Sequence, residues 1–161
     1  MSRVIRPAEP RDAAALGRVH VECWREAYAH LLSEEFRGAL DPVARGEGWS
    51  TVLAKPRADE RVSVLDVDGE LRGFAWSGRD PDDDAPRSTG LYALYVYATE
   101  YGTGAGQDLL DAVLGDAPAT LWVATDNPRA QAFYRRNGFT LDGTEKTEPT
   151  WENLRESRMV R

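Results

Sequence analysis

The segment from Leu94 to Leu110, LYVYATEYGTGAGQDLL, constrains the fold of this chain more than any other. It has the pattern of a strand, a turn with glycine at alternate positions (Gly102, Gly104 and Gly106) and an amphipathic helix. Because glycine has no Cβ atom, successive backbone N–H groups of such a turn can point at one ligand. The helix that follows adds unpaired N–H groups and the positive end of its dipole. The segment therefore predicts a site for a phosphate or pyrophosphate, and so a phosphorylated cofactor.

The size and composition of the chain exclude several classes of protein. With 161 residues, we expect one domain spanning residues 1–161. The single cysteine, Cys23, excludes an internal disulfide, and two histidines are too few for a typical zinc site, so no metal is expected. A net charge of −7 argues against nucleic-acid binding. No apolar run approaches the ~18 residues of a membrane span and no signal peptide is visible. We therefore expect a cytoplasmic protein without a membrane partner.

The order of the expected elements is that of a mixed α/β domain. We expect strands at residues 4–6, 62–67, 71–77, 91–96, 120–124, 139–141 and 157–160. We expect helices at residues 10–32, 33–38, 41–53, 104–115 and 127–137. Asp68-Gly69 predicts a hairpin turn, and residues 80–86 predict a solvated loop. The glycine turn then lies inside a β-loop-α-β unit.

Two familiar phosphate-binding loops fit this turn poorly. A Walker loop requires Gly-Lys-Ser/Thr, whereas Gln107 follows Gly106 here. A Rossmann fold requires G-x-G-x-x-G, and Gln107 occupies the third position. The motif also follows an antiparallel hairpin, and too little sequence remains for a second mononucleotide-binding half. We therefore expect no nucleotide hydrolysis and treat a nicotinamide-dependent oxidoreductase as a weaker alternative.

Two segments together resemble the signatures of the GNAT N-acetyltransferase superfamily. Residues 101–106, YGTGAG, are similar to Q/R-x-x-G-x-G/A, and residues 127–139, NPRAQAFYRRNGF, are similar to N-x-x-A-x-x-(F/L)-Y-x-x-x-G-F. A helix and one strand separate the two segments, as in the family, and the element order is similar over nearly the whole chain. The resemblance implies the acyl-CoA N-acyltransferase fold, a twisted and mostly antiparallel sheet with one splayed parallel pair of strands and flanking helices.

The resemblance also implies a site for acetyl-CoA, as co-substrate, between the splayed strands. In the first of these strands, the backbone of Leu94, Tyr95 and Val96 is expected to pair with the pantetheine arm. The loop amides are expected to hold the pyrophosphate; they belong to Tyr101, Gly102, Thr103, Gly104, Ala105, Gly106 and Gln107. The second signature is expected to contact the cofactor through Asn127, Ala130, Phe133 and Tyr134.

Two positions depart from the family pattern. Tyr101 replaces the usual Gln or Arg, so the resemblance implies no side-chain contact from this residue to the phosphates. Ala98 stands where proline is frequent, which loosens the turn. The backbone amides do not depend on either side chain.

Acyl transfer from a thioester to an amine requires an acid for the departing thiolate and a base for the amine. The resemblance implies that Tyr134 is the acid, because a phenol with a pKa of ~10 is protonated at neutral pH. Many relatives carry a glutamate before the glycine turn, but residues 91–97 contain no acid. Glu22, Glu26 and His20 are candidates for the base, although a solvated helix face explains the two glutamates better and a core position explains His20 better.

The acceptor pocket is expected to contain aromatic side chains, since aromatic faces attract alkylammonium groups. The candidates are Trp24, Tyr28, Trp76 and Tyr92, each of which core packing also explains. Trp151 is a further aromatic candidate. Cys23 is expected to be a buried small hydrophobe rather than a nucleophile. Residues 82–84, all Asp, could attract a cationic acceptor, but a solvated loop is the simpler interpretation.

We therefore expect an enzyme that transfers acetyl from acetyl-CoA to a primary amine by direct attack in a ternary complex, without a metal. The acceptor is a small molecule or a peptide N-terminus, and the sequence does not choose between them. The alternative from another class is a CoA-binding sensor that keeps the donor cleft but has no turnover. Family members often pair through their late strands, so a homodimer stays open.

Overall fold

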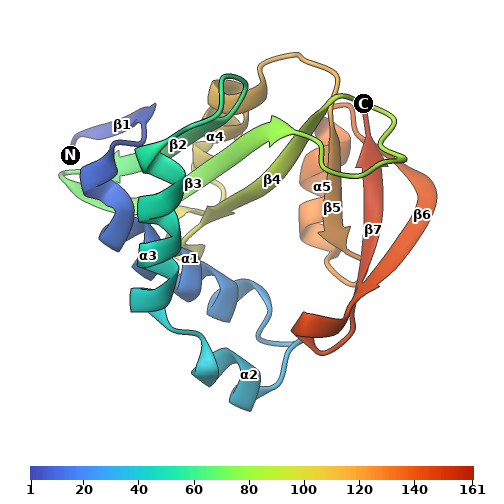
Figure 1. The fold of residues 1–161 in the computed structure, drawn as a ribbon, viewed down its shortest axis with the longest axis horizontal. Coiled ribbons are helices and arrows are strands. Elements are labelled where there is room, and N and C mark those ends of the chain that lie inside the picture. The colour runs from blue at the N-terminus through green and yellow to red at the C-terminus, as the bar shows by residue number, and fades with distance from the viewer.

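The computed structural model describes residues 1–161, and its seven strands form one sheet (Figure 1). The strands are β1 (Arg3–Pro7), β2 (Arg61–Val67), β3 (Glu70–Arg79), β4 (Thr89–Val96), β5 (Thr120–Ala124), β6 (Thr140–Glu148) and β7 (Leu154–Val160). The helices are α1 (Ala13–Ala27), α2 (Glu34–Ala39), α3 (Pro42–Ala54), α4 (Ala105–Leu114) and α5 (Pro128–Arg136). Three 3₁₀ turns complete the chain: η1 (Pro10–Asp12), η2 (Ala98–Glu100) and η3 (Pro149–Trp151). The sheet order is β1-β2-β3-β4-β5-β7-β6.

Only β4 and β5 are parallel neighbours, and they separate soon after they meet. Their pairing is limited to Gly90 with Thr120 and Leu91 with Leu121. The register of β4 against β3 then shifts so that Tyr92 is an extra, unpaired residue. A bulge of this kind bends the strand that carries it. The expectation of a mostly antiparallel sheet with one splayed parallel pair is confirmed.

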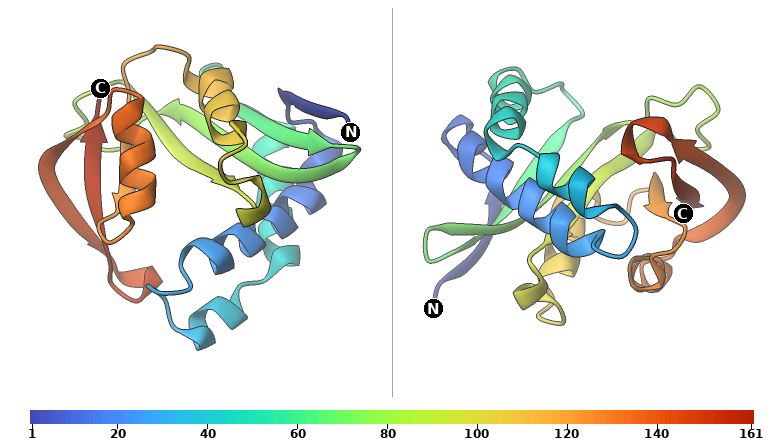
Figure 2. Two further views of the ribbon diagram at one scale, coloured as in Figure 1. Left: turned by 180° about the vertical axis from the view of Figure 1, so that it is seen from behind. Right: turned by 90° about the horizontal axis from the view of Figure 1, so that it is seen from below.

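Helices cover both faces of the sheet, and two separate cores result (Figure 2). On one face, α1 and α3 pack against side chains such as Val64 and Phe74. On the other face, α4 and α5 pack against Leu65 and Ala75. Because neighbouring residues of a strand point to opposite faces, the alternating apolar pattern of β2 and β3 supplies both cores. The splay of β4 and β5 therefore opens a passage between two helical layers.

The first long helix is shorter than the sequence predicts. We expected it to continue to about Leu32, but α1 ends at Ala27 and Tyr28 is its C-cap. Leu32 is still buried, in a cluster with Trp24 and Tyr28. The apolar periodicity therefore continues through a turn that packs against the helix without being part of it.

The last hairpin is longer than the sequence predicts. We expected a strand at 139–141, whereas β6 extends to Glu148 after an irregularity between Leu141 and Glu145. Gly143 there has a φ of +86°. As an edge strand, β6 is largely exposed and polar, so it lacks the alternating apolar pattern that identifies half-buried strands.

The loop at 80–86 is largely exposed, as expected, but three of its side chains are attached to the late strands. Asp80 accepts a hydrogen bond from Thr120 Oγ1, and Asp82 Oδ2 accepts one from Trp122 Nε1 at 2.8 Å. Asp84 pairs with the guanidinium of Arg158 at 3.2 Å. Three of the loop carboxylates therefore hold β5 and β7 in place.

None of the helices combines the length and the apolar composition that crossing a membrane requires. Nowhere do three His, Cys, Asp or Glu side chains come together as ligands for a metal ion. The two histidines lie apart: His20 is buried in α1, and His30 is exposed beyond its end.

Candidate active site

A cavity of about 640 Å³ lies where β4 and β5 separate. Its walls come from both strands, from the turn before α4, from α5 and from the last turn of α1. Since α1 and α5 lie on opposite faces of the sheet, the cavity extends from one helical layer to the other (Figure 2). It can therefore receive two ligands from two sides.

Four backbone N–H groups at the glycine turn have no acceptor within the protein. They belong to Gly102, Gly104, Gly106 and Gln107. Gly102 and Gly104 have φ values of +75° and +88°, a conformation that side chains with a Cβ rarely adopt. The free amides at the N-terminus of α4 form the kind of site that binds phosphate oxygens.

Fewer backbone amides of the glycine turn are free than the sequence predicts. The amide of Tyr101 donates to the carbonyl of Ala98 at 3.1 Å, and the amide of Thr103 donates to the carbonyl of Glu100 at 3.3 Å. The amide of Ala105 is 3.3 Å from Thr103 Oγ1. We expected all the amides from 101 to 107 to be available, but those of Tyr101, Thr103 and Ala105 already donate hydrogen bonds within the protein.

The surroundings of Gly106 show how much space lies beside the glycine turn for the arm of a cofactor. A Cβ atom at this position would lie 3.7 Å from the Phe133 ring and 3.8 Å from Leu94 Cδ2, which are ordinary contact distances. The protein itself therefore tolerates a small side chain here. Both neighbours line the cavity, so a larger side chain would fill the space between β4 and α5. The residues present fit a coenzyme A arm at this point.

The backbone of β4 offers one free edge to the cavity. Leu94, Tyr95 and Val96 pair with β3 on one side, but no strand pairs with them on the side of β5. An unpaired strand edge presents N–H and C=O groups that can bind another extended chain. The predicted pantetheine-binding strand therefore has the groups that this role requires.

Two arginines at the cavity were not predicted as site residues from the sequence. Arg129 and Arg136 both line it, and neither forms an ion pair with an acidic side chain. The guanidinium carbon of Arg129 lies 3.2 Å from the centroid of the Tyr101 ring. Together with Phe133, the two arginines stand at helical spacing on one face of α5, and that spacing could have identified them. Guanidinium groups beside free amides suit an anionic ligand.

Asn127, the first residue of the second signature, caps the N-terminus of α5. Asn127 Oδ1 accepts a hydrogen bond from the amide of Ala130 at 3.1 Å and so caps the helix. Both residues line the cavity. Asn127 Nδ2 makes no hydrogen bond within the protein and remains available as a donor.

Three tyrosine side chains meet in the passage between the strands. The hydroxyls of Tyr28 and Tyr95 are 3.0 Å apart. Burial raises the pKa of Tyr134, and the nearby Tyr28 raises it further. Tyr134 Oη has no partner in the protein, yet it is not among the completely enclosed unpaired atoms, which are Trp24 Nε1 and Arg72 Nε. The Tyr134 hydroxyl is therefore protonated and accessible from the cavity.

The aromatic candidates for the acceptor pocket divide into two pairs. Tyr28 and Tyr92 line the cavity, and so does Trp122, which the sequence did not identify. Trp24 and Trp76 do not line it. Trp24 is buried against Tyr28, and the indole of Trp76 donates to Glu60 at 3.1 Å. Core packing accounts for Trp24 and Trp76.

None of the three candidates for the base lines the cavity. His20 Nδ1 accepts a hydrogen bond from the Trp49 indole at 3.2 Å, and burial lowers the pKa of His20 to about 3. Glu22 pairs with Arg25 at 2.7 Å, and Glu26 accepts a hydrogen bond from the amide of Ala98 at 3.0 Å.

Cys23 does line the cavity, next to the end of α1. Its side chain is buried, and burial raises the pKa of the thiol. A thiol of raised pKa is a weak nucleophile, because the thiolate is the reactive form. The interpretation of Cys23 as a small buried hydrophobe stands.

Comparison with known proteins agrees with this geometry. Residues 15–139 match the model of the acetyltransferase (GNAT) family. A probable N-acetyltransferase of Mycobacterium tuberculosis is 28% identical over 145 residues, which cover 86% of this chain and 80% of that protein. An uncharacterized N-acetyltransferase of Bacillus subtilis is 28% identical over 131 residues, 77% of this chain and 73% of that protein.

Solved structures share the fold. The PaiA N-acetyltransferase of Thermoplasma acidophilum, in complex with coenzyme A, has a TM-score of 0.75 at 21% identity and covers 100% of both chains. A ribosomal-protein-alanine N-acetyltransferase of Brucella melitensis has a TM-score of 0.73 at 23% identity and covers 98% of both chains. The family model covers most of the chain, and the free amides, the splayed strands and the cavity lie within it. The chain therefore belongs to the GNAT acetyltransferase family and is an acyl-transferring enzyme.

Proposed function

We propose that this enzyme transfers the acetyl group of acetyl-CoA to a primary amine by direct attack within a ternary complex. The observation that carries this proposal is the cavity itself, which reaches both faces of the sheet. Phosphate-binding groups lie on the α4–α5 face, and the Tyr28 hydroxyl lies on the α1 face. Donor and acceptor can therefore enter from opposite faces and meet between β4 and β5.

On the donor side, we assign the binding of acetyl-CoA to backbone groups and two cations. The free amides of Gly102, Gly104, Gly106 and Gln107 would hold the pyrophosphate. Arg129 would replace the side-chain contact that Tyr101 cannot make, because its guanidinium is held against that ring. The free edge of β4 would pair with the pantetheine arm, with Ala130 and Phe133 beside it.

Tyr134 is assigned as the acid for the departing sulfur. When bound, acetyl-CoA supplies a thioester whose sulfur needs a proton as the C–S bond breaks. Burial keeps the pKa of Tyr134 above its usual value, so the hydroxyl is protonated at neutral pH. It lines the same cavity as the free edge of β4. A protonated, accessible hydroxyl at this position fits a general acid.

The acceptor is assigned as an amine of a small molecule or of a peptide N-terminus. Tyr28, Tyr92 and Trp122 present aromatic side chains to the cavity, and such faces favour alkylammonium groups. The Tyr92 hydroxyl is already engaged, because it donates to the carbonyl of Arg79. This leaves the ring of Tyr92 as the part that can contact an acceptor.

Two measurements test the proposal. Isothermal titration calorimetry should detect binding of acetyl-CoA and no binding of NAD(H). Thiol release should then be followed with a panel containing ethylamine, a diamine, L-alaninamide and an alanine-initiated peptide. Thiol release that depends on one of these amines supports the enzyme. Binding of acetyl-CoA without amine-dependent thiol release would favour the CoA-sensor alternative, and absence of binding would refute both.

A further inference from the structure

Glu156 is a buried carboxylate that has no hydrogen-bonded or ion-paired partner in the protein. Its side chain lies on β7 and is only 8% exposed. Two other acidic residues are equally buried, and each has an arginine: Asp12 pairs with Arg6, and Glu100 pairs with Arg72. Glu156 has no hydrogen bond or ion pair in the protein. Buried carboxylates are rarely left unpaired, because desolvation of the charge is costly.

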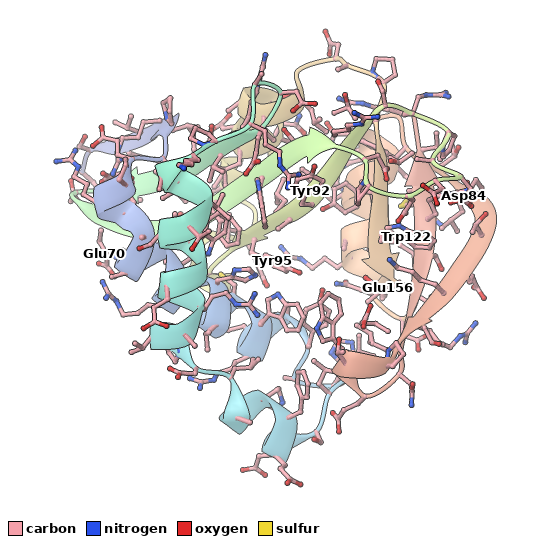
Figure 3. The ribbon with its side chains drawn as sticks, in the orientation of Figure 1. Glu70, Asp84, Tyr92, Tyr95, Trp122 and Glu156 are labelled. Carbon is pink, nitrogen blue, oxygen red and sulfur yellow. The ribbon has the colours of Figure 1, made fainter.

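The sheet register places Glu156 beside the cavity. It pairs across the strands with Ala124, the last residue of β5, and Ala124 lines the cavity. Figure 3 shows Glu156 and Trp122 on one side of the space between the strands, with Tyr92 and Tyr95 on the other side. The carboxylate is close enough to raise the pKa of both Tyr28 and Tyr95. It therefore lies near the hydroxyl pair that marks the acceptor side.

Four charged or titratable groups face Glu156 from the elements around it. They are Tyr28 at the end of α1, Tyr95 from β4, and Lys146 and Glu148 from β6, of which Lys146 pairs with Glu156 in the strand register. Burial raises the pKa of Glu156, Lys146 lowers it and Glu148 raises it again. Both tyrosines have raised pKa values, and hydrogen bonds from Thr150 lower the pKa of Glu148. The two tyrosines and Glu148 therefore keep one charge state around neutral pH.

We propose that Glu156 is the general base of the reaction: its carboxylate receives the ammonium group of the acceptor and takes one proton from it. This inference rests on the proposed function. It is supported by the side chain's burial, by the lack of a hydrogen bond or ion pair to its carboxylate, and by its place beside the aromatic acceptor side of the cavity. It also defines the acceptor class, namely amines whose reacting nitrogen is cationic at neutral pH. A lone buried carboxylate attracts such a cation and disfavours an anionic acceptor.

The proton and electron balance of the step is complete. Glu156 takes the first proton, and the nitrogen lone pair forms the C–N bond with the acetyl carbon. The C–S bond breaks, its electron pair goes to sulfur, and sulfur takes the hydroxyl proton of Tyr134. The second nitrogen proton goes to solvent, Tyr134 regains a proton, and Glu156 releases its own. One proton is released overall for each amide formed from an ammonium ion.

The test compares wild type with Glu156→Gln on two amines of nearly equal size. Ethylamine is cationic at neutral pH and needs a base, whereas trifluoroethylamine is largely neutral and does not. We expect Glu156→Gln to reduce kcat at least about 100-fold on ethylamine and less than about fivefold on trifluoroethylamine. Glu35→Gln, on the exposed surface of α2 and outside the cavity, is the matched control and should leave both rates unchanged. Acetyl-CoA affinity, measured by calorimetry, should be equal in all three proteins.

A second measurement uses the best acceptor of the amine panel and records kcat/KM against pH. Wild type should lose activity as the pH falls through the raised pKa of Glu156, and Glu156→Gln should lack that acidic limb. Equal losses on both amines, or an unchanged acidic limb, would overturn the proposal. A rise in KM with unchanged kcat would reduce Glu156 to a cation-binding residue and so overturn its role as base. Failure of wild type with every amine would instead refute the proposed function.

Discussion

The two sides of the cavity are built in different ways. The donor side consists mostly of backbone groups from two continuous segments, residues 94–107 and 127–136. The acceptor side consists of side chains that are far apart in the sequence. They are Tyr28 at the end of α1, Tyr92 and Tyr95 from β4 and Trp122 from β5. Glu156 of β7 lies beside this wall, paired with Ala124.

This difference explains why only one side has a sequence signature. Free amides require small residues and a turn of a certain conformation, and both are visible as glycines at fixed spacing. A pocket made of side chains requires only that several strands and a helix meet. Nothing in the sequence fixes the spacing between such residues. Four experiments test this difference between the donor side and the acceptor side.

The largest effect is expected at the donor side, from Gly106→Val. Its methyl groups would fill the space between Leu94 and Phe133, where the free edge of β4 meets α5. We expect acetyl-CoA affinity to fall about 1,000-fold, or about 4 kcal/mol, in calorimetric titrations. Gly48→Val is the matched control, because a Cβ atom there has no neighbour within 4 Å and α3 lies away from the cavity. A loss of less than about tenfold would show that the arm does not pass Gly106.

Tyr134→Phe tests a single hydroxyl where the two sides meet. We expect kcat to fall about 100-fold, which corresponds to about 2.7 kcal/mol at the barrier, because the sulfur loses its proton donor. Acetyl-CoA affinity should stay within about twofold of wild type, since the ring is retained. Tyr97→Phe is a suitable control, because Tyr97 does not line the cavity. Thiol release by Tyr134→Phe at nearly the wild-type rate would remove Tyr134 from the mechanism.

Arg129→Gln tests whether the donor side depends on backbone groups alone. We expect acetyl-CoA affinity to fall about five- to tenfold and its salt dependence to decrease, because one cation is lost. Arg135→Gln removes the same charge from the same helix, but Arg135 is exposed and contacts Gln131 instead of the cavity. Equal losses in the two variants would attribute the effect to net charge rather than to a contact.

The smallest effect concerns stability at the acceptor side. The pKa of Glu156 is raised in the folded protein, so folding favours its protonated form. The resulting stabilisation is complete below the unfolded pKa of about 4.3 and is lost as the pH rises through the folded pKa. Glu156→Gln removes this loss, so the variant should have a Tm about 1–3 °C higher than wild type at neutral pH.

Thermal unfolding of wild type and Glu156→Gln, followed by circular dichroism, tests whether the variant has the higher Tm. The difference in Tm should be larger at about pH 8 than at about pH 5, where more of Glu156 is protonated. Glu22→Gln should show no such trend, since Glu22 is ion-paired at the surface. A Tm for Glu156→Gln below that of wild type at both pH values would mean that the carboxylate stabilises the fold.

Local sequence patterns determined the fold class, most element boundaries and the position of the free amides. Strand β5 has the expected bounds, and Gly104 and Asn127 are helix caps, as their residue types favour. These features depend on backbone conformation and apolar periodicity, which neighbouring residues set. The continuation of the edge strand β6 to Glu148 was not predicted, because its exposed residues carry no such periodicity.

Tertiary structure alone decided which side chains share the cavity. It places Tyr28 and Tyr92 at the cavity and buries Trp24 outside it. It also bonds the amides of Tyr101 and Thr103 to carbonyls of the η2 turn. Glu156 has no distinguishing neighbours in the sequence, and only the pairing of β5 with β7 brings it to Ala124. The physical reason is that strand pairing and burial join residues distant in the chain, whereas a sequence motif records only local conformation.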